Sequence, residues 1–487
     1  MSLPAARVEW QDASTVTELL STMTTTSAAP RKLPRPSLFA LRPSWLSLDS
    51  VAILLLVLLS SAFVISEVPA NPAFSPFDEY VYADYLDKVP SQLVVRAGDE
   101  TGELARNELS CRGVRFFETI GESCNAGTHD RDELYPYAGT TAADIYAPVY
   151  FVATWTLAQP LVATGVGLVD AGRLVGVLWL SLGLSLLFIL LRRLRVDKVL
   201  ALASALLVFA APVSFWNSTY LSTDAPTLAL SAAMGILAVD AIRGRRSVWW
   251  LVPVAIVAVL TKVQNLGSVA LVALAILIAA VHPAVRDVVR ADHDQPDDLT
   301  VRSPAGPRLS MVLAACAIAG VALVTQVAWL AVRAFLRAPG YVATPIDFNN
   351  PDLTPAAILG EAFRFLLNVG DAGVDHDLVD AVTVTVLTAV CITGTLGLAL
   401  SSSATGVGPV RRWLVGVPTL VTALIFGPML AIGSHVIAGY YFELPTRYGV
   451  VLLPFLVCCA AVYFTRVPWI RFPALALGGI LALATFL

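Results

Sequence analysis

The residues of this chain best suited to chemistry are two adjacent carboxylates, Asp78 and Glu79. They closely follow the first long apolar segment, and an acidic pair beside lipid suggests a functional site because charge is costly there. A helix over 78–88 would place Asp78, Tyr82 and Tyr85 on one face. A carboxylate beside aromatic rings is partly desolvated and a better base, and such rings can stack on sugars. We therefore predict Asp78 and Glu79 as catalytic and Tyr82 and Tyr85 as substrate-binding; two solvated loop acids are the alternative.

Four more polar residues stand at the ends of later apolar segments. Asp224 precedes one segment, Lys262 ends another, and Arg447-Tyr448 opens a third. Two cations at headgroup level suit a phosphate, so Lys262 and Arg447 are predicted to bind one. Asp224 and Tyr448 are predicted to contact the substrate. Simpler interpretations remain open: Asp224 complements a helix dipole, and Lys262 reaches towards the interface. Arg447 would then pair with Glu443.

Metal chemistry has weaker support in the sequence. Asp78 and Glu79 are hard oxygen ligands of the kind that Mg²⁺ or Mn²⁺ prefers, so a divalent cation is one interpretation. His376 and His435 have no partner histidine at helical spacing, and there is no C-x-x-C pair. We therefore predict no metal ligand set.

The elements that must position these residues are membrane helices. The chain has 57% hydrophobic and 14% charged residues and a mean hydropathy of +0.73, which places it outside the soluble range. Apolar runs of about 17–25 residues match the bilayer core. We predict an all-α, polytopic bundle of about eleven spans, near 50–66, 171–191, 199–216, 225–242, 248–263, 266–282, 311–334, 380–400, 413–432, 446–464 and 472–487. Ala147–Val166 is predicted to lie at the outer interface.

Lys and Arg give the orientation. Residues 1–48 carry five of them in a Ser/Thr/Pro-rich stretch, which predicts a disordered cytoplasmic tail. The same orientation puts the later basic clusters inside: Arg192, Arg193, Arg243, Arg411, Arg412, Arg466 and Arg471. Polar stretches 68–147 and 335–379 then lie outside within the transmembrane domain 49–487. Cys111 and Cys124 share the first of these in an oxidising compartment, so a disulfide is predicted.

The order of these motifs resembles the GT-C-fold membrane glycosyltransferases. An apolar span is followed by Asp78-Glu79, a Tyr/Pro-rich approach at Tyr135-Pro136-Tyr137, and a span that starts near Arg173. Ser222-Thr223-Asp224, Leu260-Thr261-Lys262 and Arg447-Tyr448 with Pro454 follow in the expected order. The usual His-Pro-Pro before the interfacial helix is absent, and the first loop is longer. A narrower similarity, to actinobacterial membrane proteins with Pro-x-Asp-Glu after the first span, adds nothing about substrate.

The resemblance implies an inverting enzyme at the outer face of the plasma membrane. Its donor would be a polyprenyl-phosphate sugar, and its acceptor an envelope glycan, lipid or protein. Asp78 would match the family's base, and Lys262 and Arg447 the residues that hold the donor phosphate. The lipid bilayer is the other expected partner, and nucleic acid is not expected.

Two other classes of protein remain open. A transporter or flippase of a lipid-linked or envelope substrate would carry ionisable residues near mid-span and paired broken helices, which the sequence does not show. A non-catalytic assembly or receptor protein could use the acidic outer loops for binding.

Overall fold

A computed structural model describes residues 47–117, 120–282, 285, 308–341, 352–374, 377–401 and 409–487 of this chain. The chain divides into two units, Met1–Ser47 and Leu48–Leu487. The tail predicted over 1–48 lies almost entirely outside the described residues. The described residues form helices, with no strand and two isolated β-bridges, so the all-α prediction is confirmed for this part of the chain.

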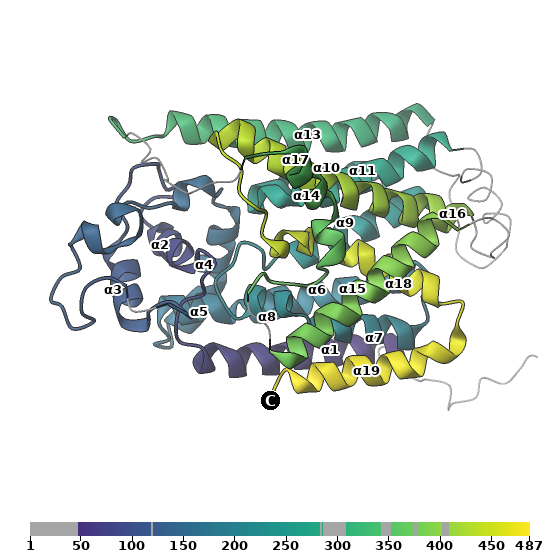
Figure 1. Cartoon of the computed structure of the whole chain (residues 1–487), viewed down its shortest axis with the longest axis horizontal. Coiled ribbons are helices and arrows are strands. Elements are labelled where there is room, and N and C mark those ends of the chain that lie inside the picture. The colour runs from purple at the N-terminus through teal and green to yellow at the C-terminus, as the bar shows by residue number, and fades with distance from the viewer. Residues whose placement is uncertain are drawn as a thin grey trace, which may run out of the picture. The chain divides into compact units, whose positions relative to one another are not determined.

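The principal helices are α1 (Leu48–Ala70), α2 (Glu79–Lys88), α3 (Glu103–Arg112), α4 (Val149–Val162), α5 (Leu168–Leu174), α6 (Gly176–Arg193), α7 (Lys198–Phe209), α8 (Pro212–Ser218), α9 (Thr227–Ile242), α10 (Leu251–Thr261), α11 (Leu266–Val281), α13 (Arg308–Phe335), α14 (Pro355–Leu367), α15 (Leu378–Ala399), α16 (Pro409–Arg411), α17 (Val417–Ala438), α18 (Leu453–Phe464) and α19 (Arg471–Ala484). Short 3-10 turns join several of them, and a π-helical segment, Arg412–Gly416, leads into α17. Figure 1 shows the long helices lying side by side.

Six helices among the described residues are long and apolar enough to cross a membrane: Leu48–Ala70, Leu168–Arg193, Val263–Val281, Arg308–Phe335, Leu378–Ala399 and Arg412–Ile437. Each coincides with a span predicted from the sequence. The pair α7 and α8, bent by 64°, would make a seventh. This supports a membrane protein in a lipid bilayer but does not confirm eleven spans.

The other predicted spans are helices that are too short by themselves. They are Thr227–Ile242, Val248–Thr261, Leu453–Phe464 and Pro468–Ala484, and Val149–Val162 occupies the stretch predicted to lie at the interface. Three of them begin or end close to a candidate site residue, because the backbone leaves the α-helical conformation there. Hydropathy alone counts such a polar end as part of the span.

Glycines set the closest helix contacts in the bundle. A Cβ added at Gly183 of α6 would lie 2.8 Å from Leu228, and one at Gly235 of α9 would lie 2.8 Å from Leu190. Small residues of this kind let membrane helices approach closely and gain van der Waals contact. The pair α6 and α9 therefore forms a tight centre of the bundle.

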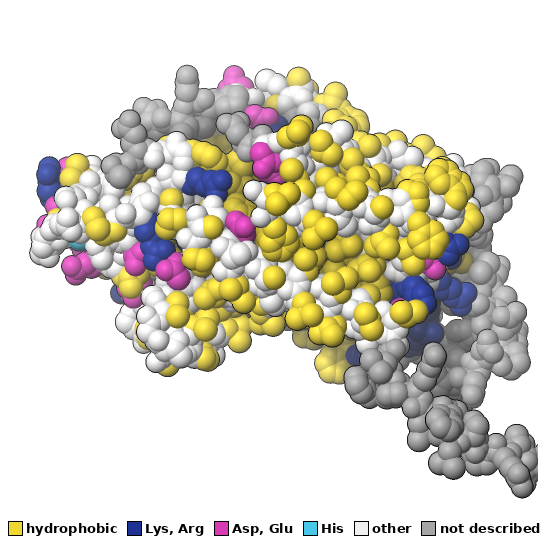
Figure 2. Space-filling view, turned by 90° about the horizontal axis from the view of Figure 1, so that it is seen from below, with side chains coloured by type: hydrophobic (Ala, Val, Ile, Leu, Met, Phe, Trp, Pro, Cys, Tyr) yellow, Lys and Arg dark blue, Asp and Glu magenta, His cyan; other side chains and the backbone are white. Residues whose placement is uncertain are grey.

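The surface of the bundle is apolar between two charged ends. Large hydrophobic side chains of α13, such as Leu313, Val324 and Val327, are 53–67% exposed. Figure 2 views the bundle from the side away from α13 and shows hydrophobic side chains along that face too, with Lys and Arg gathered at the end of the bundle away from α2 and α3. Such an exposed band is what contact with lipid tails requires.

The predicted outer loop 68–147 is a folded segment with its own apolar core, which includes Phe74, Tyr85 and Leu109. It holds α2, α3 and three short 3-10 turns, and it lies at the left end of the helices in Figure 1. The sulfurs of Cys111 and Cys124 are bonded, with 4.5 Å between the Cα atoms. In the stretch 335–379 the structure describes α14, whereas 342–351 and 375–376, with His376, lie outside the described residues.

Candidate functional site

Four elements meet at one end of the bundle and place the predicted charges together. Asp78 immediately precedes α2 with a left-handed backbone, φ 62°. Asp224 lies just before α9, where its carbonyl accepts from the Thr227 amide at 3.0 Å. Lys262 follows α10 in an extended conformation. Arg447 belongs to the 3-10 segment Thr446–Val451 that leads into α18. Residues far apart in sequence thus share one site.

The charges form a compact, balanced cluster. Lys262 Nζ lies 2.6 Å from Asp224 Oδ2. The Arg447 guanidinium lies 3.8 Å from Asp224 Oδ2 and also 3.8 Å from Asp78 Oδ2. Side-chain exposure is 5% for Lys262, 2% for Asp224 and 11% for Arg447, but 40% for Asp78. Asp78 is therefore the member of the cluster that an external molecule can reach.

Aromatic rings cover the cations. Lys262 Nζ lies 5.1 Å from the centre of the Tyr448 ring, and Arg447 Cζ lies 5.5 Å from it. The Phe77 ring lies on Arg447 at 4.2 Å. Cation–π contacts of this kind strengthen where water is excluded. Tyr448 is thus placed in the predicted cluster, where it contacts the cations directly.

A chain of hydrogen-bonded hydroxyls connects Thr223 to Asp78. The Thr223 hydroxyl donates to Tyr82 (3.4 Å), Tyr82 donates to Tyr146 (3.2 Å), and Tyr146 donates to Asp78 Oδ2 (3.4 Å). Burial, followed by the charge of Asp78, raises the pKa of Tyr82 well above its ordinary value. Burial, with Tyr82 and Asp78 next, does the same to the pKa of Tyr146. Both phenols therefore stay protonated and remain donors.

Glu79 points away from this cluster although it follows Asp78 directly. Its carboxylate is fully buried and accepts from Arg173 Nε at 2.7 Å and Nη2 at 2.9 Å. The backbone amides of Ser75 and Leu221 also donate to it, at 2.7 and 2.8 Å. The left-handed backbone at Asp78 separates the two side chains. Glu79 ties the start of α2 to α5 and to the segment before α9.

Tyr85 also lies apart from the charged cluster. Its ring stacks on Phe151 at 3.9 Å, and its hydroxyl donates to the carbonyl of Leu93 at 3.2 Å. It belongs to the apolar core of the segment 68–147. Tyr85 therefore supports α2 rather than facing the same side as Asp78.

Asp224 lines a small cavity. Asp224, Trp179 and Asn217 are among its lining residues. The Asp224 Oδ1 atom and the Trp179 indole nitrogen are buried and have no hydrogen-bond partner among the described residues. Asp224 thus uses one oxygen on the cations and keeps the other as an open acceptor.

The hydrogen bonds that the Glu79 carboxylate accepts also determine whether it can bind a divalent cation. Both oxygens of its carboxylate already accept N–H donors, so Asp78 and Glu79 do not offer a pair of free ligands. No group of three or more His, Cys, Asp or Glu side chains among the described residues could hold a metal ion. The residues present do not fit a metal held by Asp78 and Glu79.

The structure does not match the simpler interpretations of Arg447, as a partner of Glu443, and of Lys262, as a side chain that reaches towards the interface. Glu443 forms its ion pair with Arg364, whereas Arg447 faces the two aspartates. Lys262 is buried and pairs with Asp224 instead of reaching towards the interface. The sequence interpretation missed Tyr146 as the donor to Asp78 and Arg173 as the partner of Glu79. An arginine in the first turns of an apolar span was the available signal for Arg173.

No family model matches the chain, and no curated protein or solved structure matches it.

Proposed function

We propose that this protein is a membrane glycosyltransferase that moves a sugar from a polyprenyl-phosphate donor to an envelope acceptor, with inversion. The observation that carries the proposal is the juxtaposition of an accessible carboxylate with two buried cations. Asp78 lies 3.8 Å from Arg447, which lies 3.8 Å from the Asp224 carboxylate that holds Lys262. Base and phosphate-binding groups are the two functions that such a transfer needs in one place.

In this mechanism Asp78 takes the proton of the acceptor hydroxyl. The hydroxyl oxygen then bonds to the sugar C1 as the bond from C1 to the phosphate oxygen breaks, with inversion at C1. The electron pair leaves with the lipid phosphate, whose growing charge Arg447 and Lys262 stabilise. The Asp78 carboxyl keeps the proton until the product leaves. No redox partner is required.

The other residues act by position. Asp224 holds Lys262 at 2.6 Å, so the ammonium is fixed before the donor arrives. Tyr146 and Tyr82 hold the Asp78 carboxylate through hydroxyl donors. Glu79, bonded to Arg173, fixes the backbone from which Asp78 projects. Pre-organised dipoles and charges of this kind cost no reorganisation during reaction.

The membrane placement belongs to the same proposal. We infer a GT-C-like layout of about eleven spans in the plasma membrane, with the N-terminus in the cytoplasm and the site outside. Basic residues stand at the helix ends opposite the site: Arg193 ends α6, Arg471 begins α19, and Arg243 and Arg466 come just after α9 and α18. This supports the proposed orientation under the positive-inside rule. The site then faces the leaflet in which an envelope acceptor would be found.

A strain that lacks the gene provides the test. Envelope glycans and glycolipids would be compared between the deletion strain and strains complemented with wild type, Asp78→Asn or Asp87→Asn. Asp87 lies on the same helix but faces Gly102, whose added Cβ would lie 3.6 Å from its Oδ2, so it is the matched control. We expect one missing sugar linkage that wild type and Asp87→Asn restore and Asp78→Asn does not. Full restoration by Asp78→Asn would reject Asp78 as the base.

One observation favours a transporter or flippase as the second candidate. The helices α7 and α8 are bent by 64° at a short break, and broken helices form the binding sites of many transporters. Proteoliposomes loaded with a labelled polyprenyl-phosphate sugar separate the two functions. Movement across the bilayer with the sugar–phosphate bond intact favours transport, whereas release of the sugar to an acceptor favours transfer.

A further inference from the structure

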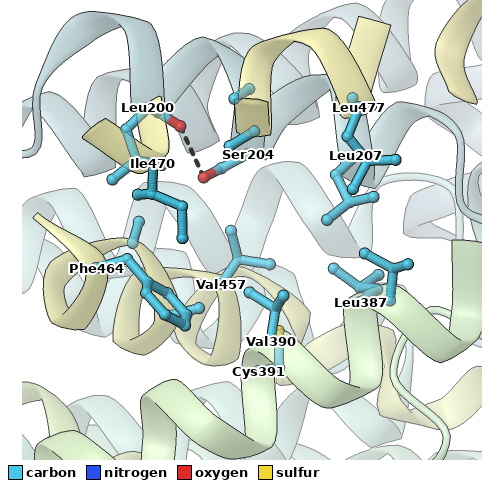
Figure 3. Close-up of a pocket in the computed structure, with 16 residues that line it drawn as sticks. Leu200, Ser204, Leu207, Leu387, Val390, Cys391, Val457, Phe464, Ile470 and Leu477 are labelled. Carbon is cyan, nitrogen blue, oxygen red and sulfur yellow. Dashed lines mark hydrogen bonds between the residues drawn. The ribbon is translucent and has the colours of Figure 1, made fainter. Parts of the chain in front are cut away.

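An apolar groove between α7, α15, α18 and α19 lies away from the candidate site. Its lining includes Leu207, Leu387, Val457, Phe464 and Leu477, and Figure 3 shows these side chains around one open space. Leu477 is 40% exposed, so the groove reaches the surface of the bundle. The hydroxyl of Ser204 is already used, since it donates to the Leu200 carbonyl at 2.8 Å. The walls therefore offer hydrocarbon contact and almost no hydrogen bonds.

The groove is held open by rigid helix pairs on either side. A Cβ added at Gly478 of α19 would lie 2.8 Å from the Ala203 carbonyl of α7. A Cβ added at Gly394 of α15 would lie 2.2 Å from the Ala460 Cα of α18. Each pair is thus closed by backbone-level contact, and the space between the pairs cannot be removed by moving one helix alone.

Arginines lie near one end of the groove. Arg466 is two residues beyond Phe464, a lining residue. Arg411 immediately precedes the π-helical segment Arg412–Gly416, which packs on α18, where the Cys459 thiol donates to the Val415 carbonyl at 3.7 Å. Burial, followed by the charges of Arg195 and Arg466, lowers the pKa of Arg411 in agreement with this packing. Neither Arg411 nor Arg466 forms an ion pair among the residues that the structure describes. Trp469 is 71% exposed beside them, as expected of an aromatic residue at a membrane interface.

We propose that this groove binds one hydrocarbon chain of an anionic phospholipid, whose phosphate contacts Arg411 and Arg466. An apolar slot among membrane helices is dry, so its occupant is a hydrocarbon chain and not water. The arginines select an anionic headgroup over a neutral one. Groove residues occupy the second half of α18, from Val457 to Phe464, whereas Arg447 precedes α18 at its other end. A phospholipid of the surrounding leaflet, rather than the sugar donor, fits this position.

The test uses the full-length protein in detergent, exposed to phosphatidylglycerol or phosphatidylcholine, with bound lipid counted by native mass spectrometry. Ala474→Phe fills the groove from α19, whereas Ala476→Phe puts the same ring on an exposed position of that helix. We expect phosphatidylglycerol bound to wild type and Ala476→Phe, and at least a tenfold loss in Ala474→Phe. The double variant Arg411→Gln/Arg466→Gln should lose the preference for phosphatidylglycerol over phosphatidylcholine.

A second measurement guards against a misfolded variant. Added phosphatidylglycerol should raise the Tm of wild type and of Ala476→Phe, and leave that of Ala474→Phe unchanged. Equal binding of both lipids by all four proteins would overturn the proposal. Displacement of phosphatidylglycerol by an equimolar polyprenyl phosphate would also overturn it, because the groove would then belong to the donor's lipid chain.

Discussion

The ammonium of Lys262 lies 2.6 Å from the carboxylate of Asp224, and both side chains are almost completely removed from solvent. They come from the end of α10 and from the segment before α9. A buried ion pair is costly to form but more costly to break, since the remaining partner is left as an unpaired charge. This pair therefore fixes the geometry of the site. Variants of its two residues can distinguish an effect on sugar transfer from an effect on the free energy of unfolding.

Breaking the pair from either side should destabilise the protein. Lys262→Met or Asp224→Leu alone leaves one buried charge, and we expect each to cost about 3–5 kcal/mol of unfolding free energy. The double variant removes both charges and should recover most of that loss while it fails to transfer sugar. Denaturation in detergent and the envelope assay give the two readouts. Additive losses in the double variant would show that the two side chains do not interact.

Removing the charge of Asp78 should lower the transfer rate, whereas removing the charge of Glu79 should lower the stability of the protein. Asp78→Asn changes a side chain that is 40% exposed, so folding should be unaffected while the transfer rate falls by about 10²–10⁴-fold. Glu79→Gln disrupts a fully buried pair with Arg173 and should lower stability by about 3–5 kcal/mol. Tm and transfer rate would be measured for both. A stable but inactive Glu79→Gln would place Glu79 in the chemistry itself.

The tyrosines beside Asp78 predict how stability depends on alkaline pH. Burial raises the pKa of Tyr82 and of Tyr146 well above the ordinary value in the folded protein. In the unfolded chain they ionise near pH 10, so the unfolded state gains from deprotonation first. Their contribution is therefore fully present below about pH 10 and is lost as pH rises further. Tm measured from pH 8 to 11 should fall above pH 10, and less steeply in Tyr82→Phe/Tyr146→Phe.

The disulfide should matter to the stability of the segment 68–147 and not to that of the helix bundle. Cys111 and Cys124 are 13 residues apart, and a loop of that size contributes about 3 kcal/mol in the chain-entropy model. We expect Cys111→Ser/Cys124→Ser to speed cleavage by trypsin at Arg112 and Arg115 in the folded protein. The membrane helices should keep their protease resistance. Unchanged cleavage would mean that the apolar core of this segment is sufficient without the bond.

Much of the fold and part of the site could be predicted from local sequence. Hydrophobic runs indicated the six long helices, because a span is a property of one continuous segment. The shorter helices were overestimated because hydropathy does not register where the backbone leaves the helix at Lys262 or Arg447. The polar residues at those helix ends nevertheless belong to the charged cluster.

The amino-acid sequence by itself determined the helical membrane class and the residue types Asp78, Asp224, Lys262 and Arg447. Only the tertiary structure decided that these four meet, and that Glu79 turns away to Arg173. The reason is physical: apolar periodicity specifies which segments are buried, but the approach of distant segments depends on side-chain packing between them. The left-handed backbone at Asp78 then places the neighbouring carboxylates of Asp78 and Glu79 against different partners.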